Sequence, residues 1–315
     1  MLLRKFKVLI VNNVCPIPYQ SYGEMLVDGF TDAGCEVTVW PYGDIKLIPP
    51  KFDLYFFMDI RYDPKDIPWY LNPRVVFSFD AHGTGPASWV EHSQYFDYVA
   101  LASLPDLLAV AKSVPAGRTL HMREACNTRI HRELVPLDER EFTIGYIGNP
   151  NDNLLRNGLS KDSLRLHMKA SIPESIDLKI DGGHNATAFG HDYCALLNSM
   201  KLCLDWPVSH NVGTRIFEAS AAGCAVMRPV TDDDAVSGLL SVFTPWEHYI
   251  PYEISLEGFT AAYEQARADD WALARKVAKQ AQALVLAEHT YAKRCETLIR
   301  TIFPGLGLFV APDPQ

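Results

Sequence analysis

Short apolar runs recur along this chain, and each is long enough for one buried β-strand. The first run, Lys7–Val11, is followed by apolar residues at helical spacing up to Gly34, and Glu36–Trp40 is the next run. A strand, a helix and a second strand in this order predict a β-α-β unit that opens a parallel sheet. Further strands of the same sheet are expected at Leu54–Met58, Arg74–Phe79 and Tyr98–Leu101.

A second set of strands begins after a charged, proline-containing stretch, residues 135–141. Its first strand is expected at Phe142–Ile147, and the others at Ile176–Ile180, Leu202–Asp205 and Ala225–Met227. A chain of 315 residues is long enough for two domains that each bury a core. We therefore predict two α/β domains, residues 1–138 and 139–285, with residues 286–315 as a terminal helix and tail that return to the first domain. The helical pattern itself is almost unbroken over Leu256–Ile302.

Composition and charge indicate the cellular compartment and the class of partner. The seven cysteines are scattered and include no C-x-x-C pair, which is typical of reduced thiols in the cytoplasm. The formal net charge of −9 argues against a surface built to bind nucleic acid, although a local basic groove for DNA stays compatible with it. No signal peptide or membrane span is predicted. We expect a cytoplasmic protein and make no prediction of its oligomeric state.

The stretch Gly213–Pro229 predicts a turn, a helix that stops at Gly223, and a buried strand. Thr214, Arg215 and Glu218 share one face near the amino end of this helix because they are three and four residues apart.

The amino end of that helix suits a diphosphate, because its backbone N–H groups are free and carry partial positive charge. Arg215 can add charge-assisted hydrogen bonds to the same group. One turn further along the helix, Glu218 can accept the two hydroxyls of a ribose. The alternative is a solvated pair between Arg215 and Glu218 on the helix surface.

The segment from Arg215 to Val226, Arg-Ile-Phe-Glu-Ala-Ser-Ala-Ala-Gly-Cys-Ala-Val, resembles the R-x-x-E-x-x-A-x-G-x-x-V stretch of glycosyltransferases of the GT-B fold. The similarity is greatest to the group related to spore-maturation-protein glycosyltransferases. Residues 144–149, 193–204 and 289–294 resemble the same group in the same order, so the resemblance covers roughly residues 139–302.

The resemblance implies an α/β protein of the GT-B type, with two Rossmann-like domains that face a central cleft and a last helix that crosses back to the first domain. It implies transfer of a sugar from a nucleotide-diphosphate sugar to an acceptor hydroxyl, with no metal and no cofactor besides the donor. By this resemblance Glu218 binds the donor ribose, and a glycine-rich loop lies beside the diphosphate. The expected donor-binding residues are Gly145, Gly148, Asn149, Arg156, Asn211, Gly213, Thr214, Arg215 and Glu218.

One position departs from the family pattern. Many retaining relatives have a second glutamate eight residues before the ribose-binding one, and this chain has His210 there. His210 and Asn211 can contact the sugar or the diphosphate, or His210 can be a polar surface residue. Whether the reaction retains or inverts the configuration of the sugar is therefore open. Arg156 can neutralise the diphosphate or lie in a solvated loop.

In the first domain, Asp80 and His82 follow an apolar strand, at the edge where open α/β sheets bind ligands. Either side chain can serve as the general base on an acceptor hydroxyl, and Asp80 can instead cap a turn. Asn12, Asn13 and the loop up to Tyr19 occupy the corresponding position after the first strand, so they are acceptor-side candidates. The acidic run Asp232–Asp234 is interpreted as a helix cap rather than a metal site.

Other functions stay open. A sugar-nucleotide epimerase should have G-x-x-G-x-x-G after its first strand, whereas here Val11 leads into Asn-Asn-Val-Cys-Pro. A noncatalytic nucleotide-sugar-binding module of the same fold is compatible with the motifs, and so is a phage-type glycosyltransferase that modifies hydroxymethylpyrimidine bases of DNA. The donor sugar, its base and the acceptor are not predicted.

Overall fold

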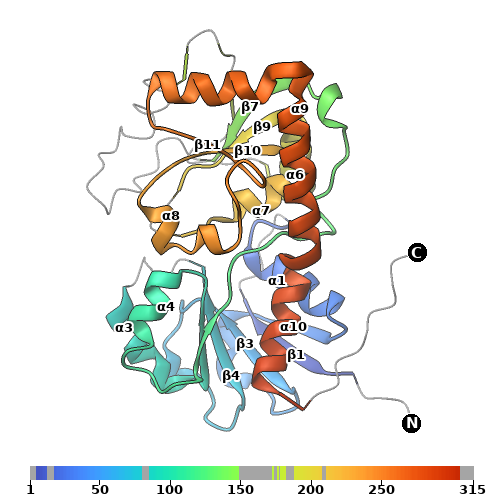
Figure 1. Cartoon of the computed structure of the whole chain (residues 1–315). Helices are drawn as coiled ribbons and strands as arrows, with labels where there is room; N and C mark the ends of the chain where they lie inside the picture. Colours follow the sequence, from blue (N-terminus) through green and yellow to red (C-terminus); the bar gives the residue numbers. More distant parts are fainter. Residues whose placement is uncertain are drawn as a thin grey trace. The chain divides into compact units, whose positions relative to one another are not determined.

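The computed structural model describes residues 5–12, 18–79, 85–148, 172–173, 176, 178–181, 188–207 and 211–305. The chain divides into two compact units (Figure 1). Unit 1 consists of Met1–Asn127 and Thr290–Gln315, and unit 2 of Thr128–His289.

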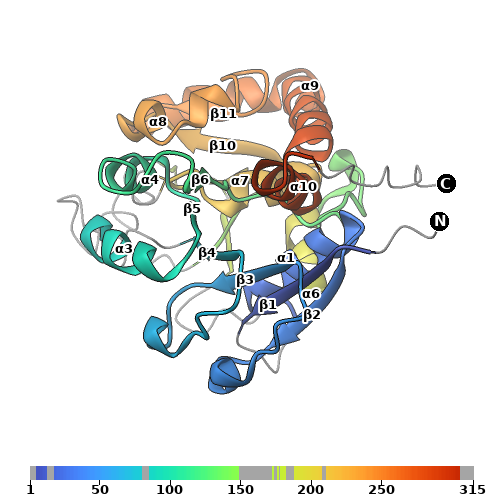
Figure 2. The ribbon, with the colours of Figure 1, turned by 90° about the horizontal axis from the view of Figure 1, so that it is seen from below.

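Unit 1 contains a six-stranded parallel sheet in the order β2-β1-β3-β4-β5-β6. The strands are β1 (Lys7–Val11), β2 (Glu36–Trp40), β3 (Leu54–Met58), β4 (Arg74–Ser78), β5 (Tyr98–Leu101) and β6 (Thr119–His121). The helices are α1 (Tyr22–Asp32), α3 (Pro86–His92), α4 (Leu104–Val110) and α10 (Tyr291–Ile302), with short 3-10 helices at Tyr42–Leu47, Pro64–Asp66 and Ser93–Tyr95. Helices α3 and α4 pack side by side, and α4 lies against β5 (Figure 2).

The central strands of unit 1, such as β1 and β3, are largely apolar because both faces of the sheet are covered there. Val8 and Ile10 belong to one hydrophobic core, and Leu9 and Val11 to the other, as alternate positions of one strand must. Helix α10 completes the first core together with α1 (Figure 1). A Cβ atom on Gly29 would lie 2.8 Å from Cβ of Tyr291, so only glycine permits this approach of the two helices.

Unit 2 contains a five-stranded parallel sheet in the order β11-β10-β9-β7-β8. The strands are β7 (Phe142–Ile147), β8 (Leu178–Asp181), β9 (Met200–Leu204), β10 (Ala225–Pro229) and β11 (Ile250–Tyr252). The helices are α6 (Gly190–Asn198), α7 (Thr214–Ala221), α8 (Asp233–Val236) and α9 (Leu256–Glu288), with 3-10 helices at Leu137–Glu139 and Leu239–Ser241. The core of unit 2 joins its central strands to α9, through residues such as Leu202, Met227 and Val277.

The expected unbroken helix over Leu256–Ile302 is interrupted twice. Helix α9 is kinked at residues 268–271, where the φ angles of Asp269, Asp270 and Trp271 are 49°, 53° and 64°. A second break precedes Thr290, whose side chain accepts a hydrogen bond from the backbone N–H of Lys293 and so starts α10. Neither break involves a proline or a glycine, which explains why the sequence pattern showed no interruption.

Other differences from the expected elements are small. The strand expected at Ile176–Ile180 is β8, and the one expected at Leu202–Asp205 begins earlier, at Met200. Strands β6 and β11, which have three residues each, were not predicted because so short a run shows no periodicity.

The units divide at 127/128 and 289/290, whereas the expected domain boundaries were 138/139 and 285/286. Residues just after position 127 are bonded within unit 2. The amide of Asn198 donates to the carbonyl of Arg132 at 3.0 Å, and its Oδ1 accepts from the N–H of Leu134 at 2.7 Å.

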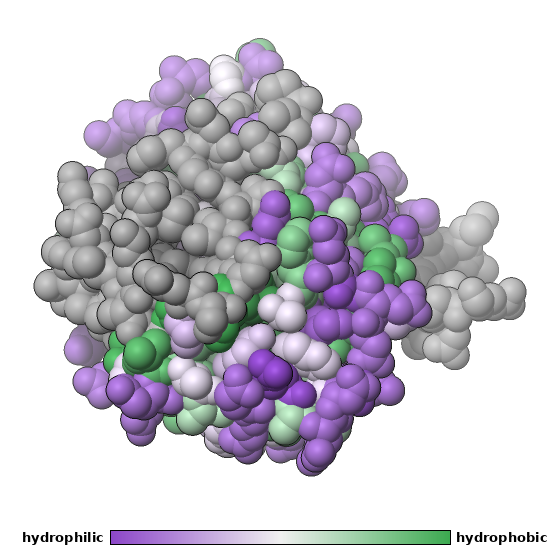
Figure 3. All heavy atoms as spheres, turned by 90° about the horizontal axis from the view of Figure 1, so that it is seen from above, coloured by the Kyte–Doolittle hydropathy of each residue, from purple (hydrophilic) through white to green (hydrophobic). Residues whose placement is uncertain are grey.

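The surface seen in Figure 3 is mostly hydrophilic where it is described, with a group of hydrophobic residues near its centre. None of the helices in the described ranges combines the length and the apolar composition that a membrane span requires. Within those ranges, the six cysteines are buried and form no disulfide.

Candidate active site

The candidate site lies where the parallel strands of unit 2 end. Gly148 follows β7, Asp205 follows β9, and α7 begins at Thr214, so all three lie at the carboxyl edge of the sheet, where α/β folds bind ligands. The residue before the helix is Gly213, which has no side chain to cap the first N–H groups of α7. The first N–H groups of α7 therefore lie at this edge without a side-chain cap from residue 213, an arrangement suited to an anion.

Arg215 is held beside the amino end of α7 by three contacts. Its Nε donates to the carbonyl of Ile147 at 2.8 Å, and its Nη1 lies 3.5 Å from Oδ1 of Asp205. The guanidinium also stacks over the ring of Tyr146, 4.6 Å from the ring centroid. Arg215 is thus bonded to the strand ends and not to Glu218, which contradicts the alternative of a solvated helix pair.

Gly148 has a φ angle of 144°, a backbone conformation that favours glycine. A Cβ atom there would lie 2.6 Å from Nη2 of Arg215, so the guanidinium packs directly on the backbone after β7. Gly145 has a different role. It lies inside β7, where a Cβ atom would lie 2.8 Å from Sδ of Met200, and its lack of a side chain serves packing within the sheet.

Replacing Gly148 with alanine is expected to weaken anion binding at the amino end of α7 at least tenfold, because the new methyl group displaces the guanidinium of Arg215. The positive φ angle should also lower stability by about 1 kcal/mol. Calorimetric titration with pyrophosphate and thermal unfolding measure the two effects. Gly43→Ala is the control, since no atom of the described residues beyond its chain neighbours lies within 4 Å of its Cβ position. Unchanged pyrophosphate affinity in Gly148→Ala would contradict a role of Arg215 in anion binding.

Glu218 is a buried carboxylate, with only 6% of its surface exposed. Its Oε2 accepts a hydrogen bond of 2.9 Å from Oη of Tyr193, and its Oε1 lies 3.7 Å from Nε2 of His131. Burial raises the pKa of Glu218 to about 7, and the bond from Tyr193, the charge of Arg215 and a bond from Thr214 limit this rise.

His131 is completely buried beside Glu218, and its ring packs edge-on against Tyr193. Burial lowers the pKa of His131 to about 3, and the nearby His191 adds to the decrease, so the imidazole is neutral at pH 7. A neutral histidine supplies no positive charge to Glu218. The carboxylate is therefore costly to ionise until a ligand donates further hydrogen bonds to it.

Tyr193 and His131 were not predicted as site residues. Tyr193 begins one of the segments that resemble glycosyltransferases, and that position was a usable signal. Nothing in the sequence around His131 distinguishes it from a surface histidine. It reaches Glu218 only because the segment after position 127 folds onto unit 2.

Arg215 is one member of a buried network of alternating positive and negative side chains. Asp205 accepts from Arg215 through Oδ1 and from Nη1 of Arg228 through Oδ2. Arg228 is fully buried in β10, and its Nε also lies 3.3 Å from Oδ1 of Asp234. Two carboxylates and two guanidinium groups alternate in this network, so each buried charge has an opposite neighbour.

The acidic run Asp232–Asp234 contains one exposed and one buried aspartate. Asp232 is exposed, whereas Asp234 is buried, contacts Arg228 and accepts a 3.3 Å bond from the N–H of Thr231, next to the start of α8. Asp234 is therefore a partner of Arg228 as well as a turn residue.

Several predicted residues lie outside the described part of the chain: Asp80, His82, Asn149, Arg156, His210 and Asn13. Asn211 is buried in the loop before α7, close in sequence to Gly213. Asn12 is also buried, and its Nδ2 donates to Oγ of Ser21 at 2.9 Å. Since Ser21 caps α1, this bond of Asn12 is a structural one.

Part of the chain is similar to a known protein family, and its fold is similar to solved structures. Residues 167–300 match the model of a family described as glycosyl transferase-like. HepE from Anabaena, solved with UDP and glucose, superimposes with a TM-score of 0.63 and 12% identity, over 94% of this chain and 99% of that one. The chain has the GT-B fold, and residues 167–300 are similar to a glycosyl transferase-like family.

Two further solved GT-B structures superimpose on this chain over almost its whole length. Sucrose-phosphate synthase from Thermosynechococcus elongatus superimposes with a TM-score of 0.60 and 14% identity, over 96% of this chain and 100% of that one. T4 phage BGT, solved with its UDP-glucose substrate, superimposes with 0.61 and 11%, over 95% and 100%. Comparison with curated protein sequences gives no significant match. These findings confirm the predicted GT-B fold and the predicted resemblance to glycosyltransferases.

Proposed function

We propose that this protein transfers a sugar from a nucleoside-diphosphate sugar, with UDP as the favoured nucleotide, to an acceptor hydroxyl. One observation carries the proposal: the uncapped amino end of α7, the anchored Arg215 and the buried Glu218 adjoin one another at the carboxyl edge of the sheet. HepE and T4 phage BGT, which share the fold, were solved with UDP or UDP-glucose.

In this proposal the diphosphate binds the first N–H groups of α7 and the guanidinium of Arg215. The ribose hydroxyls donate to Glu218, one turn further along the helix. When the sugar leaves, negative charge develops on the diphosphate, and the same helix end and Arg215 stabilise it. The positive charge needed for the leaving group thus comes from the protein, so we expect activity without a metal ion.

The first test is thermal unfolding with a panel of nucleotides and nucleotide sugars, since a ligand of the native state raises the unfolding temperature. Release of UDP is then measured with acceptors that include small hydroxylated molecules and DNA containing hydroxymethylpyrimidines, each with and without EDTA. Turnover that EDTA leaves intact supports the proposal. Donor binding without any transfer would indicate a binding module, and loss of activity with EDTA would contradict metal independence.

Gly213→Ala is expected to leave the unfolding temperature unchanged and to weaken UDP binding about tenfold. No atom of the described residues beyond its chain neighbours lies within 4 Å of the Cβ position of Gly213, and its φ angle of −66° suits alanine. A diphosphate at the end of α7 would occupy the space near the new methyl group. Calorimetric titration with UDP checks the affinity, and equal affinity in the variant and the wild type would place the diphosphate elsewhere.

Donor affinity is expected to fall as the pH is lowered through 7. Burial raises the pKa of Glu218 to about 7 in the free protein, and ribose hydroxyls bind the ionised carboxylate. Affinity should therefore be constant above about pH 8 and fall about tenfold per unit below pH 6. UDP-glucose is the suitable probe, because its diphosphate diester does not titrate in this range. Glu218→Gln should remove the slope.

A further inference from the structure

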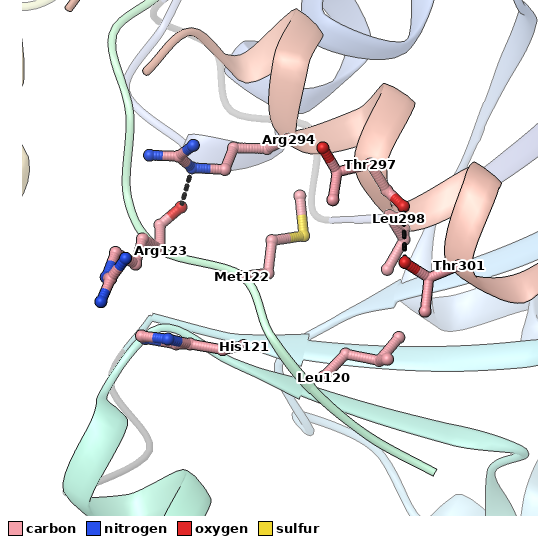
Figure 4. Close-up of a pocket in the computed structure, with 8 residues that line it drawn as sticks. All are labelled: Leu120, His121, Met122, Arg123, Arg294, Thr297, Leu298 and Thr301. Atoms are coloured by element: carbon pink, nitrogen blue, oxygen red, sulfur yellow. Dashed lines mark hydrogen bonds between the residues drawn. The ribbon is translucent and has the colours of Figure 1, made fainter. Parts of the chain in front are cut away.

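Two pockets of unit 1 differ in the side chains that line them. In the pocket between the end of β6 and helix α10, His121, Arg123 and Arg294 lie along one side (Figure 4). The other pocket has a volume of about 450 Å³ and lies at the carboxyl edge of the sheet, between β1, β2 and α1. We call it the edge pocket, and its described lining contains no lysine, arginine or histidine.

The edge pocket has the size and the composition of a small-molecule site. Three apolar residues from separate segments line it: Pro18, Val27 and Val39. Tyr19 adds to this lining, and its Oη donates to Oδ2 of Asp28 at 3.0 Å. Asp28 is buried and also accepts from Nδ2 of Asn127 at 2.7 Å, so these bonds fix one wall of the pocket. Mostly apolar cavities of about 300–1,000 Å³ with a few polar groups are typical of ligand sites.

Asn12 supplies a hydrogen-bond acceptor to the edge pocket. It is 6% exposed, and its Nδ2 donates to Oγ of Ser21 at 2.9 Å. Its Oδ1 makes no hydrogen bond within the described ranges of the chain, so it can accept one from a ligand. The amide of Asn12 packs against Gly23, the residue before Glu24, and so lies beside the first turn of α1.

Glu24 is the charged side chain of the edge pocket that is available to a ligand. It is half-buried in the first turn of α1, and its Oε2 is shielded from solvent without accepting a hydrogen bond from any described residue. It also forms no ion pair with the described part of the chain. A carboxylate that is partly removed from water and lacks a partner has a free-energy cost, which a cation beside it offsets. An anion would be repelled instead.

We propose that the edge pocket binds the protonated amine of a small organic molecule. The ammonium group would donate to the carboxylate of Glu24 and to Oδ1 of Asn12, and the rest of the molecule would contact Val27 and Val39. Asn12 and Tyr19 are also acceptor-side candidates of the sequence, so under the proposed function the amine belongs to the sugar acceptor. Only that last step rests on the proposed function, because binding of the amine can be measured without a donor.

The test is calorimetric titration of the full chain at pH 7 with benzylamine and, separately, with benzyl alcohol. The two probes have nearly the same size, and only benzylamine carries a positive charge. We expect saturable binding of benzylamine by the wild type and at least tenfold weaker binding of benzyl alcohol. Glu24→Gln should weaken benzylamine binding at least tenfold, and Glu24→Asp, which keeps the charge, only a few-fold. Glu91→Gln is the matched control, because Glu91 is an exposed glutamate of unit 1 outside the pocket.

Glucosamine is the third probe. Tighter binding of glucosamine than of benzylamine would assign the pocket to an amino sugar, and the reverse order would assign it to an amine with an apolar body. The absence of saturable binding of both amines by the wild type would overturn the proposal. Equal affinities of benzylamine and benzyl alcohol, or of Glu24→Gln and the wild type for benzylamine, would overturn it too. Should Glu24→Gln fail to fold, the comparison of the two benzyl probes on the wild type decides. Intact amine binding without any binding of UDP would contradict the proposed function alone.

Discussion

Replacing Glu218 with glutamine is expected to weaken UDP-sugar binding by tenfold to a hundredfold and, at pH 8, to make the ligand-free protein more stable. Affinity falls because glutamine cannot offer a charged acceptor to the ribose, and a hydrogen bond to a charged group contributes about 1.5–3 kcal/mol. Stability rises because the buried carboxylate has to ionise in the native state, whereas glutamine stays neutral and can still accept from Tyr193.

The size of the stability gain from Glu218→Gln depends on pH. The pKa of Glu218 is raised from 4.5 to about 7 in the folded protein, so the native state of the wild type loses stability as the pH rises through 7. The full shift corresponds to about 3 kcal/mol. The gain from Glu218→Gln should therefore be about 2 kcal/mol larger at pH 8 than at pH 5.

Thermal unfolding at both pH values and calorimetric titration with UDP-glucose measure these effects. Glu139→Gln serves as the control, since Glu139 is an exposed glutamate of unit 2. A variant that is less stable than the wild type at pH 8 would show that Glu218 is a structural residue and not one kept for a ligand.

Arg228→Met is expected to destabilise unit 2 by about 3–5 kcal/mol. The guanidinium of Arg228 lies between the buried carboxylates of Asp205 and Asp234, and its removal leaves both without their main positive neighbour. Because Asp205 also holds Arg215, donor binding should weaken in the same variant.

Two controls separate this effect from a simple change of volume. In the double variant Arg228→Met and Asp234→Asn, the remaining Asp205 keeps Arg215 as its opposite charge, so this variant should recover most of the lost stability. Arg267→Met removes an exposed ion pair with Glu264 and should cost less than about 1 kcal/mol. Equal losses in Arg228→Met and Arg267→Met, measured by chemical denaturation, would contradict a buried network.

Much of the fold could be predicted because its strands are local apolar runs. Strands such as Lys7–Val11 and Phe142–Ile147 were predicted to the residue, since strands covered on both faces are apolar without interruption. The kink at residues 268–271 could not be predicted, because Ala, Asp and Trp there carry no turn signal as strong as Gly or Pro.

For the site, the sequence alone determined that Thr214, Arg215 and Glu218 share the amino end of one helix, because helical spacing is a local property. Only the tertiary structure decided what these residues contact. Arg215 contacts Ile147 and Asp205, and Glu218 contacts Tyr193 and His131 besides Thr214 of its own helix; these four partners lie outside α7.

The burial of Arg228 in a central strand was decided in the same way. An arginine is stable there only because Asp205 and Asp234 reach it from two different segments. Local pattern therefore determined which residues form the helix tip for the diphosphate. Contacts between distant segments determined how Arg215 is held and why Glu218 has a raised pKa, because burial and charge pairing arise only when the chain has folded.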